Sequence, residues 1–231
     1  MKLFNGLLLA TIIIFSTILS SCNSDSDDGG YITAMLSFAT LTVNNDMGCT
    51  FTTQEKDDSE LVTFTSTTSL NKNEYTIGNR YLIAYNNESG ERYKSGPISL
   101  HTIYGISNGK AEDRDKSVIN NLATNMLRAS MVYREGIYIN VEATAPYMSG
   151  YVKVFNIYVD DATTGNDYPD AYLVYEPYNI NTNEYTFCGS FDISPVWNLP
   201  TCKGLHLHYY DRNGDAKTDI FVKSVSLTPS I

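Results

Sequence analysis

Alternating apolar and polar residues fill most of the chain after Gly30, a period typical of half-buried β-strands. The first half contains five such runs, each followed by a polar turn cluster: 35–43, 49–54, 61–65, 81–85 and 98–106. Short strands joined by turns of different lengths predict a small closed β-barrel over residues 31–108.

The second half continues the alternation in six further runs: 136–141, 151–159, 172–175, 185–193, 205–210 and 220–227. These runs predict a β-sandwich over residues 131–231. Residues 109–130 separate the halves and begin with polar residues, so we expect a linker there. Within it, residues 117–129 have an apolar spacing that fits either a short helix or an extended linker. The sequence therefore predicts an all-β chain with two domains.

The N-terminus has the pattern of a secretory signal. Lys2 precedes an apolar run, residues 7–19, which is shorter than the ~20 residues that a membrane-spanning helix requires. The run ends in Leu19-Ser20-Ser21-Cys22, which resembles a bacterial lipobox, where a diacylglycerol is attached to the cysteine sulfur and the chain is cut in front of it. We therefore predict a signal peptide over residues 1–21 and lipidation of Cys22. The alternative is a plain secretory signal with an incidental cysteine.

A flexible acidic tether over residues 22–30 follows the predicted lipidation site. It resembles the export signal of Bacteroidetes surface lipoproteins, with Asp25, Asp27 and Asp28 as its acidic positions. The resemblance implies an outer-membrane lipoprotein that faces the cell exterior. An orientation toward the periplasm is the alternative.

Composition limits the partners. The chain has 16 basic and 26 acidic side chains and a formal net charge of −10, and it becomes more acidic when Lys2 leaves with the signal peptide. This charge disfavours nucleic acid and anionic membrane surfaces, so we expect no nucleic-acid partner and membrane contact only through the lipid anchor. The 18 tyrosines and Trp197 could stack on an uncharged glycan or peptide, although tyrosine is also an ordinary strand residue.

One acidic segment has part of a calcium-binding pattern. Oxygen-bearing side chains stand at relative positions 1, 3, 5 and 9 of a calcium loop: Asp211, Asn213, Asp215 and Asp219. Ala216 stands where that loop needs glycine, and Val222 stands where it needs glutamate. The Asn213-Gly214 pair between two alternating runs favours a β-hairpin, so the four residues are weak calcium candidates.

Two further residue pairs have candidate chemistry. His206 and His208 lie two apart on a predicted strand and share one face, as a metal-binding pair would, but no third ligand is near in the sequence. We therefore expect solvent-facing histidines and no metal. Cys188 and Cys202 form the only local cysteine pair and are candidates for a disulfide in an exported chain. Buried free thiols, with Cys49, are the equal alternative.

No segment has the pattern of a catalytic site. The chain lacks a Gly-x-Ser-x-Gly elbow, a phosphate-binding glycine loop and a dinucleotide fingerprint, and three histidines leave few bases for a catalytic triad. The many carboxylates leave a glycosidase-like pair open, but none stands out. We assign no catalytic residue and no cofactor.

Several steps along the chain resemble the NigD-like lipoproteins of Bacteroides and relatives. Residues 76–85, which contain Gly78-Asn79-Arg80, resemble a Gly-x-Arg step before an apolar strand, and residues 98–106 resemble the strand that closes the family's barrel. Residues 136–141, 189–194 and 208–218 resemble steps of its second domain. The resemblance implies an N-terminal five-stranded OB-like barrel, a C-terminal β-sandwich and a lipid anchor. It implies no catalytic residues, and the family's name comes from a bacteriocin locus.

These observations together predict a non-catalytic binding or accessory lipoprotein whose ligand is a glycan, a peptide or another envelope protein. Two alternatives from other classes stay open. One is a glycan- or peptide-hydrolysing enzyme with an unrecognised site. The other is a protective, immunity-like protein related to a bacteriocin.

Overall fold

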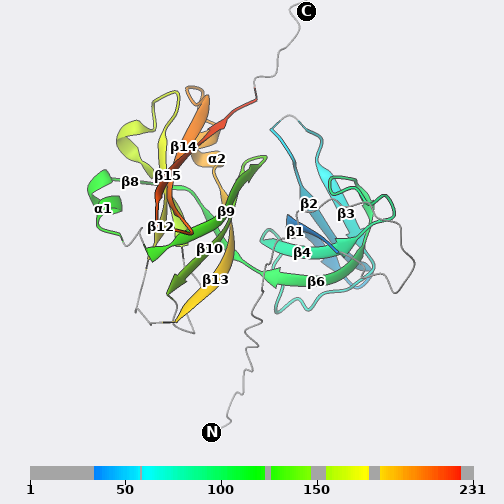
Figure 1. Ribbon diagram of the computed structural model, residues 1–231. Coiled ribbons are helices and arrows are strands. Elements are labelled where there is room, and N and C mark those ends of the chain that lie inside the picture. Colours follow the sequence, from blue (N-terminus) through cyan, green and yellow to red (C-terminus); the bar gives the residue numbers. More distant parts are fainter. Residues whose placement is uncertain (1–33, 58, 123–125, 147–154, 177–182, 225–231) are drawn as a thin grey trace, which may run out of the picture. The chain divides into compact units, whose positions relative to one another are not determined.

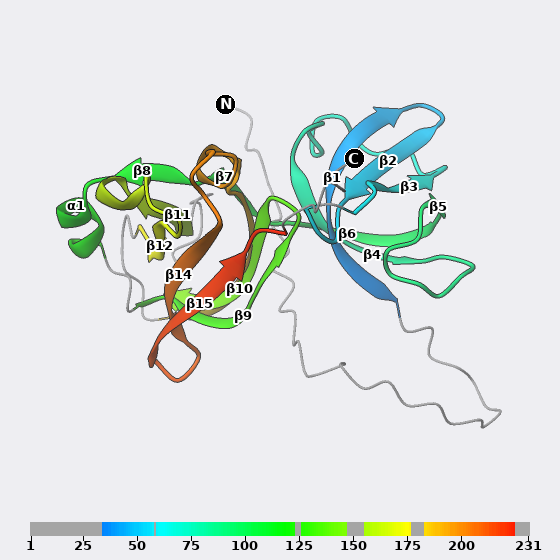
Figure 2. The same ribbon diagram turned by 90° about the horizontal axis from the view of Figure 1, so that it is seen from above.

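The computed structural model describes residues 34–57, 59–122, 126–146, 155–176 and 183–224 of the chain. Strands make up 57% of it and helices 8%, which confirms the predicted all-β class. The strands form two sheets, β1–β6 and β7–β15 (Figures 1 and 2). None of the helices in the described ranges has the length and apolar character needed to cross a bilayer. The predicted signal peptide, Cys22 and the acidic positions of the tether lie outside the described residues.

The first sheet is a nearly closed barrel. Its strands are β1 (Met35–Asn45), β2 (Gly48–Thr53), β3 (Val62–Ser66), β4 (Arg80–Asn86), β5 (Gly96–Pro97) and β6 (Ser99–Gly105). The hydrogen-bonded order is β5-β3-β2-β1-β4-β6, and only the β3–β5 pair is parallel. β5 and β6 are consecutive pieces of one segment, separated by Ile98, whose N–H donates to the Thr65 carbonyl at 2.8 Å. This segment therefore pairs with β3 at its start and with β4 afterwards, which brings the two ends of the sheet together.

Alternation along each strand fills the barrel with apolar side chains. The buried cluster includes Leu41 from β1, Phe51 from β2, Phe64 from β3, and Ile83 and Tyr85 from β4. The opposite face of β1, β2 and β3 has a Thr-x-Thr sequence in each strand. Register aligns these threonines across the strands, with Thr40 opposite Thr52, Thr52 opposite Thr63, and Thr50 opposite Thr65.

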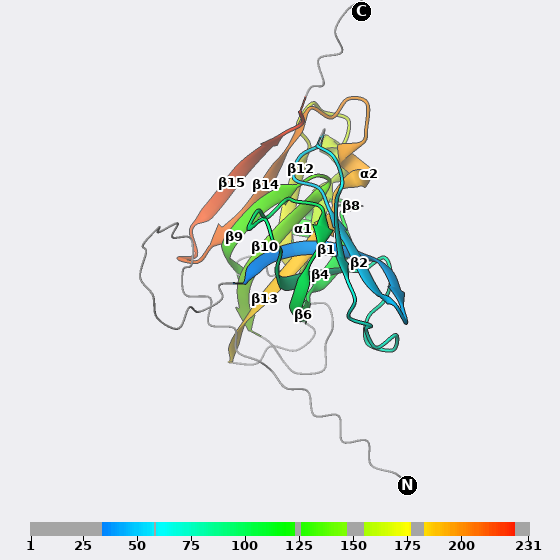
Figure 3. The same cartoon turned by 90° about the vertical axis from the view of Figure 1, so that its right-hand side faces the viewer.

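The second sheet has nine strands: β7 (Ser107–Lys110), β8 (Glu112–Arg114), β9 (Arg128–Glu135), β10 (Tyr138–Pro146), β11 (Phe155–Asp160), β12 (Asp170–Tyr175), β13 (Glu184–Asp192), β14 (Gly204–Asp211) and β15 (Ala216–Val222). The order is β7-β13-β10-β9-β14-β12-β11-β8. β15 pairs with β14 (Figure 3). Ala111 separates β7 from β8, and its N–H donates to the Asp192 carbonyl at 2.8 Å. One short segment thus joins β13 to β11.

The core of the second sheet lies between β9, β10 and β13 on one side and β11, β12 and β14 on the other. Fully buried side chains come from both layers: Ile139, Val141, Ile157, Val159, Leu205, Leu207 and Phe191. Trp197 completes the core from α2 (Ser194–Trp197) and is 1% exposed. The two layers are joined at the edges by the β7–β8 segment and by two residue pairs between β9 and β14.

The segment 109–130, for which we expected a linker, supplies structure to the second sheet. It contains the end of β7, β8, the short helix α1 (Lys116–Asn120) and the start of β9. The Asp115 side chain accepts a hydrogen bond from the Ser117 N–H and so caps α1, and Ile119 packs on Tyr158 and Val174. A short 3₁₀ helix, η2 (Asp161–Thr163), follows β11. Independent folding of the two sheets as separate domains stays a prediction.

Candidate functional site

A buried polar cluster around Arg80 joins the two sheets. Arg80 begins β4 and is 3% exposed. Its guanidinium donates to Ser190 Oγ at 2.6 Å and to the Phe38 carbonyl at 3.1 Å, and it lies 3.9 Å from the centre of the Tyr138 ring. Burial lowers the pKa of Arg80, and the negative charge of Glu135, whose Oε2 lies 3.7 Å from Nη2, opposes that shift.

Glu135 at the end of β9 is the anion of this cluster, and its oxygens already have donors. The Tyr93 hydroxyl donates to Oε1, as does Arg92 Nη2 at 3.3 Å, while Asn140 Nδ2 donates to Oε2 at 2.7 Å. Burial, followed by the negative charge of Glu135, raises the pKa of Tyr93. The carboxylate is therefore held in a structural network and is not free to act as a catalytic base.

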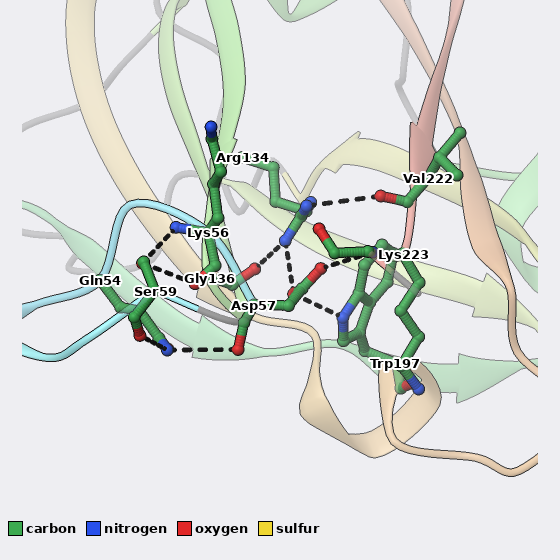
Figure 4. Close-up of polar contacts among 10 residues, drawn as sticks. Gln54, Lys56, Asp57, Ser59, Arg134, Gly136, Trp197, Val222 and Lys223 are labelled. Carbon is green, nitrogen blue, oxygen red and sulfur yellow. Dashed lines mark hydrogen bonds and ion pairs between the residues drawn. The ribbon is translucent and has the colours of Figure 1, made fainter. Parts of the chain in front are cut away.

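A second set of contacts joins the β2–β3 loop to the second sheet (Figure 4). Asp57 Oδ1 accepts hydrogen bonds from Arg134 Nη1 at 2.7 Å and from Trp197 Nε1 at 3.0 Å, and its Oδ2 accepts one from the Ser224 N–H at 3.1 Å. The Arg134 guanidinium also lies 4.6 Å from the centre of the Trp197 ring. These three bonds hold the Asp57 carboxylate against the second sheet, so this cluster is also structural.

A groove on the barrel surface is one of the hollows that the described residues form. Its volume is about 510 Å³, and we call it the barrel groove. The end of β1, the β1–β2 turn, β2, the end of β3 and β5 line it: Val43, Asn45, Met47, Gly48, Cys49, Thr50, Thr65, Ser66, Thr67, Pro97 and Ile98. Val43 and Met47 are 41% and 85% exposed, which makes the groove apolar and open to ligand.

The barrel groove is lined by no charged side chain. Its one ionisable group is Cys49, and burial raises the pKa of that thiol, so the reactive thiolate is disfavoured. Thr50 of β2 and Thr65 of β3, which lie opposite each other, add neutral hydroxyls to the lining. The groove can therefore offer apolar contact and neutral hydrogen bonds, but no acid–base chemistry.

A cluster of two imidazoles and one carboxylate lies on the outer face of β12 and β14. Asp170 Oδ1 lies 2.8 Å from His208 Nε2 and 3.3 Å from His206 Nδ1. We call these three residues the His–Asp cluster, and each side chain is about one-third exposed. Tyr172 stacks on His208 with 4.6 Å between ring centres, and Tyr168 stacks on His206 with 5.6 Å.

The weak calcium candidates lie in and beside the β14–β15 hairpin. Asp211 Oδ1 accepts the N–H groups of Asn213 and Asp215 at 2.9 and 3.0 Å, and the Asp215 bond is the main cause of the lowered pKa of Asp211. Asp219 accepts the Tyr209 hydroxyl across the hairpin at 3.0 Å. The hairpin therefore forms, and the carboxylates of Asp211 and Asp219 bond to the chain itself.

The three described cysteines outside the predicted lipidation site are free thiols. Phe187 and Phe191 of β13 pack against the core, so alternation turns Cys188, half-buried, to the opposite face. Cys202 lies in the core and contacts the Gly204 carbonyl. The candidate pair Cys188 and Cys202 is therefore not bridged in the structure.

The sequence did not reveal Asp170 as the partner of the two histidines. The parallel register between β12 and β14 places Asp170 beside His206, 36 residues apart in the chain, and no local pattern encodes that register. The barrel groove was also missed, because its lining comes from three separate segments of the chain. Only the His-x-His spacing was a usable signal.

Solved structures from Bacteroides share this fold, although no protein-family model and no curated protein sequence matches the chain. A protein of unknown function from Bacteroides vulgatus has a TM-score of 0.64 and 16% identity over 86% of this chain and 95% of its own. A candidate lipoprotein from Bacteroides fragilis has a TM-score of 0.55 and 11% identity over 84% and 99%. A NigD-like immunity protein from Bacteroides caccae has a TM-score of 0.54 and 13% identity over 85% and 100%. The described chain therefore has the fold of these Bacteroides proteins, the NigD-like protein among them, as the sequence resemblance implied.

Proposed function

We propose that the chain is a lipid-anchored, non-catalytic binding lipoprotein whose barrel groove takes an uncharged segment of a glycan or peptide. The observation that carries this proposal is the absence of any charged side chain from the lining of the barrel groove. General acid–base catalysis needs a titratable group within hydrogen-bond reach of the ligand, and electrostatic catalysis needs aimed charges or dipoles. A groove without charged side chains is suited to binding a ligand.

The groove also limits the chemistry of its ligand. An anionic ligand would find no cation in the lining, and a cationic one would find no carboxylate. Apolar surface from Val43 and Met47, with hydroxyls from Thr50 and Thr65, fits a sugar ring or an extended peptide backbone. Binding of this kind is little screened by salt, so we expect an affinity that changes less than about twofold between low and high salt.

A charge placed at the mouth of the groove tests the site. The full-length chain carrying Cys22→Ala is screened for binding to neutral glycans and peptides, and Met47→Glu is then made in it. Met47 is 85% exposed, so the fold tolerates the change, while an unpaired carboxylate beside a neutral ligand lowers affinity. We expect a loss of about tenfold or more.

Ile77→Glu is the matched control, because Ile77 is also exposed, at 56%, and does not line the groove. Equal affinity in the two variants would place the ligand elsewhere. Turnover of a glycan or peptide that a single carboxylate substitution abolishes would overturn the non-catalytic assignment.

We also propose lipidation at Cys22 and display on the outer face of the outer membrane. The lipobox-like Leu19–Cys22 and the acidic Asp25, Asp27 and Asp28 support this, and a fold shared with a candidate lipoprotein agrees with it. Multiple acyl chains give stable anchoring, where a single chain is marginal.

Two variants separate anchoring from display. In detergent phase partitioning, Cys22→Ala is expected to move the protein from the detergent phase to the aqueous phase. Cys188→Ala, which removes a different thiol, is the control and should leave the protein in the detergent phase. Replacement of Asp25, Asp27 and Asp28 by alanine is expected to leave the anchor intact but to protect the chain from protease added to whole cells. Replacement of Ser24 and Ser26 controls for the length and polarity of the tether. Unchanged cleavage in the aspartate variant would remove the export role.

An immunity-like role is a second candidate, favoured by the fold shared with the NigD-like immunity protein from Bacteroides caccae. Under this function the barrel groove would bind an uncharged segment of a bacteriocin. Deletion of the gene would then sensitise the cell to a co-resident bacteriocin, and Met47→Glu would fail to restore protection. Unchanged sensitivity in the deletion strain would rule this role out.

A further inference from the structure

The His–Asp cluster lies away from the barrel groove and is built by strand register. Asp170 is the first residue of β12, and the parallel pairing sets it opposite His206 and sets Tyr172 opposite His208. Side chains two apart on a strand point to the same face, so the four residues share the outer face of the second sheet. The core residues Leu205 and Leu207 alternate with the histidines and fix this orientation.

The ring planes of both histidines are held by their neighbours. Each imidazole is nearly parallel to a tyrosine ring, with interplanar angles of 17° for Tyr168–His206 and 16° for Tyr172–His208. The Thr218 hydroxyl of β15 lies 2.9 Å from His208 Nδ1, while His208 Nε2 faces Asp170. His206 Nδ1 and His208 Nε2 therefore both face one carboxylate oxygen of Asp170.

We propose that Asp170, His206 and His208 bind one divalent first-row transition-metal ion, with zinc as the reference. Two imidazoles and one carboxylate are a ligand set that suits zinc, copper and nickel. At bonds of about 2.0–2.1 Å, two ligand atoms on a tetrahedral zinc are about 3.3 Å apart. The oxygen-to-nitrogen distances of 2.8 and 3.3 Å are already close to that value.

A modest rearrangement completes the site. The described residues contain no ready-made metal cage, because the carboxylate oxygen itself occupies the point on which the two nitrogens converge. The imidazole centres are 6.5 Å apart, against about 5 Å on a tetrahedral ion, so the rings must approach by about 1.5 Å. Rotation of the one-third-exposed Asp170 side chain opens the central point and keeps an oxygen as a ligand.

The bound ion would keep one position open. Three protein ligands leave a fourth site for water or for a donor from a ligand, as in open zinc sites. If His208 binds the metal through Nε2, its imidazole proton is on Nδ1. The Nδ1–H group can then donate a hydrogen bond to the Thr218 hydroxyl oxygen. Thr218 would then orient His208 without contacting the metal.

Zinc titration of the full-length chain with Cys22→Ala tests the proposal directly. We expect one equivalent of zinc to bind, with a micromolar or tighter Kd, and we expect cobalt to give the visible spectrum of a tetrahedral nitrogen–oxygen site. His206→Ala, His208→Ala and Asp170→Asn each remove one ligand at the surface and should weaken binding at least about 100-fold. Thr218→Val should weaken it by about tenfold to 100-fold.

Two controls separate this site from other donors. His101→Ala removes an exposed histidine on β6 and should leave the affinity unchanged, and Cys188→Ala excludes a thiol ligand. Circular dichroism of each variant confirms the fold before titration. Millimolar or weaker zinc binding, or tight binding that survives His208→Ala in a folded chain, would overturn the proposal. Since this site lies on the second sheet, its outcome is independent of the test of the barrel groove.

Discussion

Arg80 shows how one residue can connect two sheets. Gly78 just before it has φ +93°, in the region that favours glycine, and its N–H donates to the Leu41 carbonyl at 2.8 Å. This turn starts β4 so that Tyr81 and Ile83 enter the barrel, and alternation points Arg80 to the opposite face, toward Glu135. The sequence Gly78-Asn79-Arg80 thus directs Arg80 to the junction between the two sheets.

Arg80→Met is expected to lower the free energy of unfolding by about 3 kcal/mol, because the variant leaves Glu135 buried with a weaker positive field around it. Urea denaturation followed by circular dichroism measures the loss. Arg92→Met is the matched control, since Arg92 contacts the same carboxylate but its side chain is 41% exposed. A loss below about 1 kcal/mol is expected there. Equal losses would contradict the role given to Arg80.

We expect the tyrosines around Glu135 to make the folded chain less stable at alkaline pH. Burial, then the charge of Glu135, raises the pKa of Tyr133 to about 12, and burial raises that of Tyr85 to about 12. A group whose pKa is raised in the folded state contributes stability that is fully present below the pKa of the unfolded chain, which is about 10 for tyrosine. That stability is lost as the pH rises through the folded-state pKa, about 12 here. Urea midpoints should therefore fall between pH 10 and 12.

Tyr133→Phe should make that fall shallower, because phenylalanine has no proton to lose. The matched control is Tyr104→Phe, at a half-buried tyrosine on β6 outside the cluster. The same alkaline slope in wild type and Tyr133→Phe would show that Tyr133 does not contribute to it.

The β1–β2 hairpin depends on a glycine for two independent reasons. Gly48 has φ +139°, and a Cβ there would lie 2.0 Å from the Ser66 carbonyl oxygen. Gly48→Ala is therefore expected to cost about 1–3 kcal/mol from backbone strain, and more from displacement of β3. Gly165→Ala is the control, because it has no positive φ and nothing within 4 Å of the added carbon. Thermal unfolding of the two variants compares them, and equal melting temperatures would refute the packing argument.

Strand positions could be predicted from the sequence wherever alternation was strong. The runs 81–85 and 205–210 lie within β4 and β14, and both strands bury apolar side chains at alternate positions. β7 and β8 were missed because they are four and three residues long and mostly polar, and edge pairing with β13 and β11 stabilises them instead of burial. The helical spacing of residues 117–129 gave only α1, because β9 begins at Arg128 and takes up the end of that run.

Sites were less predictable than strands, since they depend on register between distant segments. His206 and His208 were visible as a pair, but Asp170 became their neighbour only through the parallel β12–β14 pairing. Glu135 gave no local signal as the partner of Arg80, 55 positions earlier in the chain. Sequence patterns thus predicted which residues face outward but not which of them meet.

Both sheets close by the same means, a single segment broken by one residue that changes its pairing partner. Ile98 separates β5 from β6, and Ala111 separates β7 from β8, and each interrupting residue is buried and bonded through its N–H. The two segments thus pair the outer edges of β3 and β4 and of β13 and β11, and paired edges are not open to unwanted strand pairing. Both breaks lie within 13 residues of each other in the sequence, so a short stretch of chain closes the barrel and then the second sheet.

Asp57 offers a test of how strongly the two sheets depend on each other, because it extends from the β2–β3 loop to Arg134, Trp197 and Ser224 (Figure 4). Asp57→Ala leaves the Arg134 guanidinium without its carboxylate in a site where both side chains are mostly buried, and we expect a loss of about 3 kcal/mol in the free energy of unfolding. Trp197 is the only tryptophan, so the emission comes from this site alone. Loss of the bond to Nε1 should shift the emission to the red as water replaces Asp57.

Asp46→Ala in the β1–β2 turn is the matched control, because that aspartate side chain is 96% exposed and pairs only with Lys72 at the surface. Its effect on unfolding should be below about 0.5 kcal/mol, with no change in emission. If Asp57→Ala also left the emission and the stability unchanged, the β2–β3 loop would not hold the sheets together. Arg80 would then be the main polar link between them, and Arg80→Met alone should make the two sheets unfold at different urea concentrations.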